Sequence, residues 1–198
     1  MIKIWTIKNF DLEELPEWVA QHFIKLKPYV SEFLTARHPY RNGMVCPFVS
    51  RAIKDDEIYF TYYEDGPRSN ITKLIDLCIY HYQGRISRTP GSIIIIFRED
   101  FNIPSLLRFH IAHKERCIKN HLMLGALYAE SSAESLHSNQ YFPLRTPTPT
   151  LVLRELTASD LIFWTRNIIR LPHGANFYRH SLKSSKKIAE LLALSKAK

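Results

Sequence analysis

The chain has 198 residues, of which 45% are hydrophobic and 23% charged, so it suits one globular core and is short for two ordinary domains. Its formal net charge is +8, but residues 164–198 hold eight Lys or Arg residues against one Glu, which leaves only +1 for the rest of the chain. No signal-peptide pattern and no apolar run of about 18 residues occurs, so the sequence predicts a cytoplasmic protein without a membrane span.

The N-terminal half predicts one interrupted helix, a strand and a second helix. Residues 11–37 have apolar side chains at helical spacing, but Pro28 lies inside the segment, so we expect a kinked helix or two short ones. Residues 57–63 alternate and are rich in aromatic side chains, which is typical of a strand. Residues 70–84 predict a helix that has Asn70 as its N-cap.

The C-terminal half alternates apolar strands with helices. Residues 92–97 form an uninterrupted β-branched run, which predicts a central strand buried on both faces. Residues 103–120 predict a helix with Pro104 in its first turn, and residues 122–129 and 148–156 predict further strands. Four strands with intervening helices and no glycine-rich phosphate loop indicate an α+β domain, with a mixed or antiparallel sheet of about four or more strands and helices packed on it.

The basic C-terminal segment predicts two further helices. One begins after the last strand, with Thr157 or Ser159 as its cap, and continues through residue 164. The other covers residues 178–198, in which leucines and lysines follow amphipathic spacing. We expect this helix to dock its leucines on the single domain of residues 1–177; binding of nucleic acid or of a membrane surface is the alternative.

Potential metal ligands occur on the helix of residues 103–120. His113, Cys117 and His121 are four residues apart, so they lie on one side of the helix beside its apolar stripe, with His110 nearby. Imidazole and thiolate are ligands for first-row metals and for haem iron. The set lacks a carboxylate and does not form HExxH, so hydrogen-bonded histidines at the edge of the core are the structural alternative.

Cys46 stands directly before Pro47, which stiffens the backbone and fixes the direction of the thiol. Arg41 and Arg51 lie on either side of it in the sequence and would favour the thiolate if they approached it. The alternative is that Cys46 and Phe48 are apolar packing residues. Because the three cysteines of the chain are widely spaced and odd in number, they indicate neither a disulfide framework nor a zinc site.

Two further arginines are candidates for binding an acidic group. Arg145 lies in a proline-rich segment that leads into the last predicted strand, and Arg154 lies on that strand. A guanidinium binds a carboxylate or phosphate through two parallel hydrogen bonds. The alternative is an ordinary ion pair with Glu155 or Asp160.

These stretches resemble an uncharacterised bacterial family that carries a domain of unknown function. The resemblance rests on VCPFVSRAI at residues 45–53, HLMLGALY at residues 121–128 and NQYFPLRTPTPTLVLREL at residues 139–156. It covers about residues 36–165. Membership in such a family implies no particular reaction.

The CPF motif and the proline-rich arginine segment are also similar to YcgG-type haem proteins, which include enzymes that hydroxylate a guanidino nitrogen of arginine. This similarity implies that Cys46 and Phe48 shape a pocket wall and that a histidine ligates haem iron. We choose His113 as that ligand, and therefore as the predicted metal ligand, from its position on the helix. The alternatives are His38, His110 and His121.

Two functional hypotheses follow. The first is a haem-dependent oxygenase or hydroxylase of a small amine or amino-acid-like substrate, served by a redox partner. In it Arg145 and Arg154 hold the haem propionates or a substrate carboxylate, and Arg41 and Arg51 contact the substrate. The second is a non-enzymatic binding domain for an anionic metabolite or, through the basic tail, for nucleic acid.

Overall fold

A computed structural model describes residues 3–65, 70–157 and 160 of the chain. The chain divides into two compact units, Met1–Glu155 and Leu156–Lys198, and the following fold is that of the first. In chain order its elements are β1 (Trp5–Thr6), α1 (Glu17–Pro28), the π-helix η1 (Tyr29–Phe33), α2 (Val49–Lys54), β2 (Ile58–Tyr62), α3 (Ile71–Gln83), β3 (Ser92–Ile96), α4 (Ile103–Lys119), β4 (Leu122–Leu127) and β5 (Thr150–Glu155).

The five strands form one mixed sheet in the order β1-β2-β3-β5-β4. β2 and β3 are parallel, whereas β1 pairs antiparallel with β2, and β5 pairs antiparallel with both β3 and β4. The predicted α+β class with a mixed sheet is therefore confirmed. All four predicted strands are present with shorter ends, and β1 is an additional short strand at the edge.

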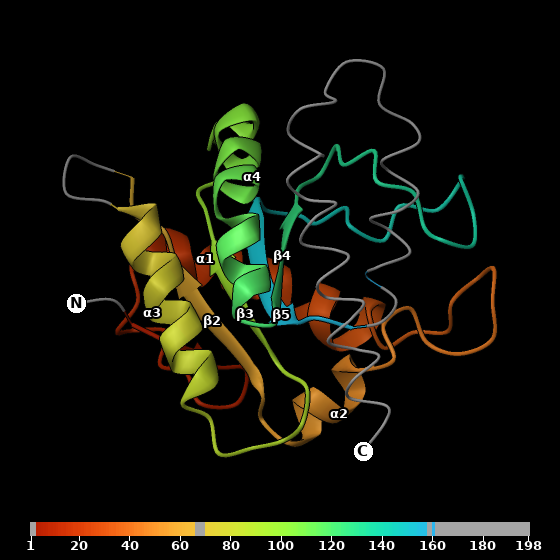
Figure 1. The fold of residues 1–198 in the computed structure, drawn as a ribbon, viewed down its shortest axis with the longest axis horizontal. Coiled ribbons are helices and arrows are strands. Elements are labelled where there is room, and N and C mark those ends of the chain that lie inside the picture. Colours follow the sequence, from red (N-terminus) through yellow and green to blue (C-terminus); the bar gives the residue numbers. More distant parts are fainter. Residues whose placement is uncertain (1–2, 66–69, 158–159, 161–198) are drawn as a thin grey trace. The chain divides into compact units, whose positions relative to one another are not determined.

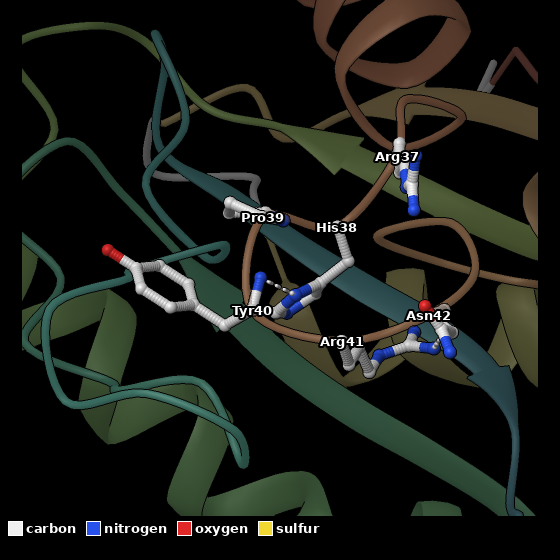
Figure 2. A pocket seen from close by; sticks show the side chains of 6 residues that line it. All are labelled: Arg37, His38, Pro39, Tyr40, Arg41 and Asn42. Carbon is white, nitrogen blue, oxygen red and sulfur yellow. Dashed lines mark hydrogen bonds between the residues drawn. The ribbon is translucent and has the colours of Figure 1, made fainter.

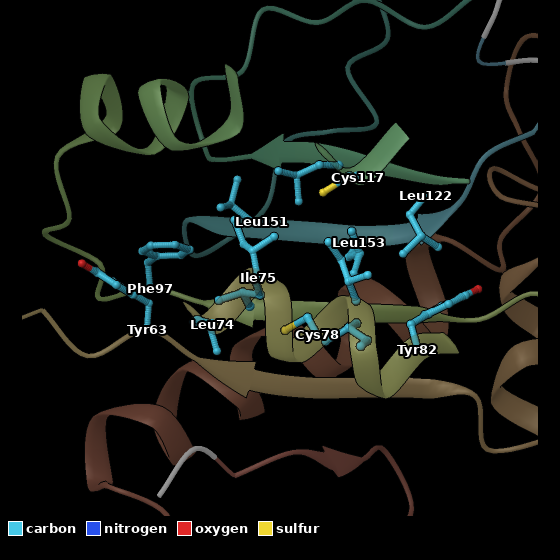
Figure 3. Packing of buried hydrophobic residues seen from close by; sticks show 14 of the residues in the cluster. Tyr63, Leu74, Ile75, Cys78, Tyr82, Phe97, Cys117, Leu122, Leu151 and Leu153 are labelled. Carbon is cyan, nitrogen blue, oxygen red and sulfur yellow. The ribbon is translucent and has the colours of Figure 1, made fainter. Parts of the chain in front are cut away.

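β3 lies in the middle of the sheet and is buried on both faces. Ile93 and Ile95 belong to the core cluster that α3 and α4 cover, and Ile94 and Ile96 belong to the cluster that α1 covers. Figure 1 shows α3 and α4 on one side of the sheet and α1 on the other, and Figure 3 shows side chains from α3, α4 and the sheet meeting in the first cluster. The prediction of a central strand is confirmed, and the sheet is the middle of three layers.

Local sequence signals explain where the two long helices begin. The Asn70 side chain accepts a hydrogen bond from the backbone N–H of Lys73 at 3.1 Å, so it caps α3 as predicted. Asn102 caps α4 in the same way through the N–H of Ser105 at 2.9 Å, and Pro104 lies in the first turn.

The first predicted helix differs from the expectation in its second half. The α-helix begins at Glu17 and continues as far as Pro28, where the π-helix Tyr29–Phe33 follows it directly. The expected kinked helix or pair of short helices over residues 11–37 is thus a shorter α-helix with a π-helical end. α2 was not expected; its buried residues Val49 and Ala52 join the cluster under α1.

Several predictions concern residues outside the described part of the chain. They are the helix through residue 164, the tail helix of residues 178–198 and the domain boundary between residues 177 and 178. They stay predictions. Within the residues that are described, no helix has both the length and the apolarity required to cross a membrane.

Candidate functional site

The π-helix positions the aromatic base of the site. π-Helical turns are rare and occur frequently at functional sites. The Tyr29 hydroxyl donates a hydrogen bond to the carbonyl oxygen of Pro143 at 2.6 Å. The rings of Tyr29 and Phe33 stack at 5.3 Å, and Phe33 is 6.2 Å from Tyr141. The π-helix thus attaches the segment around residues 141–143 to the body of the protein.

The loop that follows the π-helix is closed by its own backbone. The N–H of Val45 donates to the carbonyl of Ala36 and the N–H of His38 to that of Gly43, both at 2.9 Å. Gly43 has a φ of 99°, a conformation that a residue with a Cβ rarely adopts. The Arg41 guanidinium donates to the carbonyl oxygens of residues 42, 44 and 45. Arg41 therefore holds the loop together.

This loop lines an open depression of about 550 Å³. Figure 2 shows the six side chains that line it, which are Arg37, His38, Pro39, Tyr40, Arg41 and Asn42. Among the described residues, the Arg37 guanidinium has no hydrogen-bond or ion-pair partner. The lining thus combines two positive charges and an amide with one buried imidazole.

His38 is buried and joins this loop to the segment of residues 131–145. Its Nδ1 accepts a hydrogen bond from the backbone N–H of Tyr40 at 3.0 Å, so a neutral ring carries its proton on Nε2. That nitrogen lies 3.2 Å from the Ser135 hydroxyl and donates to it. The His38 ring also contacts the Tyr141 ring, with centroids 4.9 Å apart. Burial lowers the pKa of His38, and the nearby Arg41 and His137 lower it further.

The Ser135–His38 pair does not have the arrangement of a nucleophile and its base. A general base must offer an unprotonated nitrogen to the serine hydroxyl. Here the unprotonated Nδ1 is occupied by a backbone N–H, and Nε2 is a donor. The pair therefore links two loops and does not activate Ser135.

The residues predicted around Cys46 separate in the structure. Cys46 is half-buried, packs against the core cluster under α1 and donates its N–H to the carbonyl of Leu34 at 2.8 Å. Phe48 is 44% exposed at the start of α2. The Arg51 side chain is 76% exposed and pairs with Asp55 at 3.4 Å. Only Arg41 of this set lines the depression.

The predicted ladder on α4 does not form a ligand set. His113 is half-buried, with Nε2 3.5 Å from the Thr72 hydroxyl on α3, and burial is the main cause of its lowered pKa. His110 donates from Nε2 to the carbonyl of Leu124 at 2.9 Å, and burial lowers its pKa to about 4. Cys117 lies fully in the core, where burial raises its pKa to about 12. His121 is exposed beyond the end of α4.

The two candidate arginines of the C-terminal half make local contacts. Arg145 donates from Nε to the carbonyl of Ser131 at 3.0 Å, and its guanidinium lies 4.1 Å from the centroid of the Phe142 ring. Arg154 donates to the carbonyl of Glu155 at 2.8 Å. Asp160 accepts hydrogen bonds from the N–H and hydroxyl of Thr157, the predicted cap, at 2.7 and 2.9 Å.

These positions do not fit a haem site within the described residues. His113 faces Thr72 between two helices and does not line the depression of residues 37–42. Arg145 donates to a main-chain carbonyl of its own loop. No three His, Cys, Asp or Glu side chains of the described chain are grouped to hold a metal ion. The haem prediction stays a prediction without support from this geometry.

Sequence reasoning missed Arg37, Tyr40 and Ser135. A signal was present for the loop itself, because the sequence HPYRNG combines a proline with a glycine, which is typical of a tight connection. No local signal indicated Ser135, which is 97 residues from His38.

The residues of this site lie within a match to a known protein family. Residues 23–189 match the model of the family described as Domain of unknown function (DUF6875). The match includes both the loop of residues 36–45 and the segment of residues 131–145. No curated protein and no solved structure matches the chain. The expected membership in an uncharacterised domain family is confirmed.

Proposed function

The chain belongs to the DUF6875 family, and we propose that it is a binding domain for a small anionic ligand, held in the depression of residues 37–42. One observation carries the proposal. The Arg37 guanidinium lines the depression beside Arg41 and has no partner within the described residues. Two arginines and no acidic side chain are found among the described residues that line it.

A carboxylate or a phosphate group suits this lining. A guanidinium presents five N–H donors in a planar fork, and an oxyanion accepts two of them in parallel. Arg41 uses both terminal nitrogens on loop carbonyls, so it supplies positive charge and a fixed loop. Arg37 keeps its donors for the ligand. In this proposal Arg37 takes the contacting role that the sequence indicated for Arg41.

The surroundings of the loop favour a preformed site. His38 joins the loop to Ser135, and Tyr29 joins the π-helix to Pro143. Both hydrogen bonds tie segments that are distant in sequence, so the loop needs little ordering when a ligand binds. A preformed site retains more of its interaction energy as affinity than a mobile one.

The test is a calorimetric titration of the full chain at low ionic strength, with inorganic phosphate and with citrate as the ligands. We expect saturable binding that Arg37→Gln weakens by about tenfold, because a charge-assisted hydrogen bond is lost. The matched control is Arg88→Gln, which removes the same charge from an exposed loop that does not line the depression. Equal weakening by both variants, or no saturable binding, would contradict the proposal.

The other functional hypotheses stay predictions. The haem-dependent hydroxylase depends on the resemblance to YcgG-type proteins, and an absorbance titration with haemin tests it. Nucleic-acid binding depends on residues 178–198, which lie outside the described part of the chain.

A further inference from the structure

A second depression, of about 360 Å³, lies where β2 and β3 end. Its lining consists of Asp65, Arg98, Asp100, Phe101, Asn102, Ser105 and Phe109. β2 and β3 are parallel neighbours, so their carboxyl ends reach the same edge of the sheet.

The two carboxylates in this depression are not neutralised by the described chain. Asp65 and Asp100 have no hydrogen-bond or ion-pair partner among the described residues. Arg98 lies on the same rim, but its guanidinium is over the Trp18 ring, 4.7 Å from the centroid. The nearby Lys25 is paired with Glu99 at 2.7 Å.

The donors of Ser105, in the first turn of α4, are used within the helix start. The N–H and the hydroxyl of Ser105 both donate to the Asn102 side chain, at 2.9 Å each. Arg108 in turn donates to the Ser105 hydroxyl at 2.7 Å. Asn102 therefore caps the helix start. The lining carries two aspartates against one arginine, Arg98, so its net charge is negative.

Aromatic rings complete the lining. Phe101 and Phe109 are half-buried, with centroids 5.9 Å apart. Each also contacts the buried Tyr63 ring, at 5.9 and 5.7 Å. Packing against Tyr63 thus fixes the positions of both rings. A cation above an aromatic face is attracted to it, and a nearby carboxylate adds to the attraction.

From the carboxylates and the rings together, we propose that this depression binds an organic cation, namely a primary ammonium group attached to an apolar body. The ammonium group pairs with Asp65 and Asp100, and the apolar body lies against Phe101 and Phe109. The site is separate from the loop of residues 37–42: the linings of the two depressions share no residue.

Benzylamine is the probe, because it is a primary ammonium ion at pH 7 with one aromatic ring. Benzyl alcohol is its uncharged counterpart of the same size. Binding to the full chain is followed by NMR titration. We expect saturable binding of benzylamine and at least about tenfold weaker binding of benzyl alcohol, since one charged contact accounts for that ratio.

Three variants locate the site. Asp65→Asn and Asp100→Asn should each weaken benzylamine binding by about tenfold, and Phe101→Leu should weaken it severalfold. The matched control is Glu64→Gln, which changes the charge equally, one residue from Asp65, at a side chain outside the lining. Equal binding of amine and alcohol, an equal effect of Glu64→Gln, or no saturable binding would overturn the proposal.

Discussion

Arg85 and Glu57 form a buried ion pair, whose side chains expose only 6% and 7% of their surface. The Arg85 guanidinium also lies 3.6 Å from the centroid of the Tyr82 ring, and the Tyr59 hydroxyl donates to Glu57 at 3.2 Å. A Cβ at Gly91 would lie 2.4 Å from the Glu57 carbonyl oxygen, so only glycine fits beside the pair. The pair holds the connection before β3 against the start of β2.

Arg85→Leu should lower the free energy of unfolding by about 3 kcal/mol or more, because the buried Glu57 carboxylate then keeps only the Tyr59 hydroxyl and has no compensating positive charge. Urea denaturation measures it. The double variant Arg85→Leu/Glu57→Leu should be less destabilised than the single one, since no buried charge remains. The control, Arg51→Gln, affects an exposed pair and should cost less than about 1 kcal/mol. A cost of Arg85→Leu as small as that of the control would refute a structural role for the pair.

At the scale of elements, the contact between the π-helix and the segment of residues 141–143 joins two distant parts of the chain beside the candidate site. Tyr29 is half-buried and its hydroxyl donates to Pro143 at 2.6 Å. Burial raises the pKa of Tyr29 far above its ordinary value, so the hydroxyl keeps its proton and remains a donor. The π-helix thereby fixes a segment that is 114 residues away in the sequence.

Tyr29→Phe should keep the ring stacking with Phe33 and lose this single hydrogen bond. We expect a loss of about 1 kcal/mol in the free energy of unfolding and faster amide hydrogen exchange in residues 141–146. Tyr80→Phe, at a side chain that is 77% exposed on α3, is the matched control and should change neither quantity. Unchanged exchange in Tyr29→Phe would show that the segment is held by other contacts.

At the scale of the whole molecule, the buried histidines make folding sensitive to acid. Burial is the main cause that lowers the pKa of His22, His38, His81, His110 and His113. An unfolded chain takes up a proton on each histidine near pH 6.5, whereas the folded ring of His110 resists protonation until about pH 4. The unfolded state therefore binds more protons in this window, and stability falls as the pH falls below 6.5.

His110 alone should account for about 2 kcal/mol of stability lost between pH 7 and pH 5, as measured by urea denaturation at both values. Aspartates and glutamates with lowered pKa values contribute little to this loss of stability between pH 7 and pH 5. Their pKa values in the unfolded chain already lie below pH 5. His110→Gln keeps a donor for the carbonyl of Leu124 and should remove that part of the pH dependence. An identical loss in the variant would assign the acid sensitivity to the other histidines.

Local patterns were sufficient to predict most elements of the fold. The run of isoleucines in β3 specifies a strand buried on both faces, because alternate side chains point to opposite sides. Asn70 indicates the start of α3, because a cap interacts with residues only three positions away. Such signals depend on residues only a few positions apart, so they can be recognised in a single sequence.

The candidate site depended on contacts that no local pattern specifies. β5 inserts between β3 and β4, His38 meets Ser135, and Arg145 turns to the carbonyl of Ser131. The sequence correctly placed His113 and His110 on a helix. It did not indicate their partners, which are the Thr72 hydroxyl on α3 and the Leu124 carbonyl on β4. The sequence by itself determined the elements and their buried faces. Only the tertiary structure decided which polar groups meet, because such pairs join distant segments whose relative position is set by packing of the whole core.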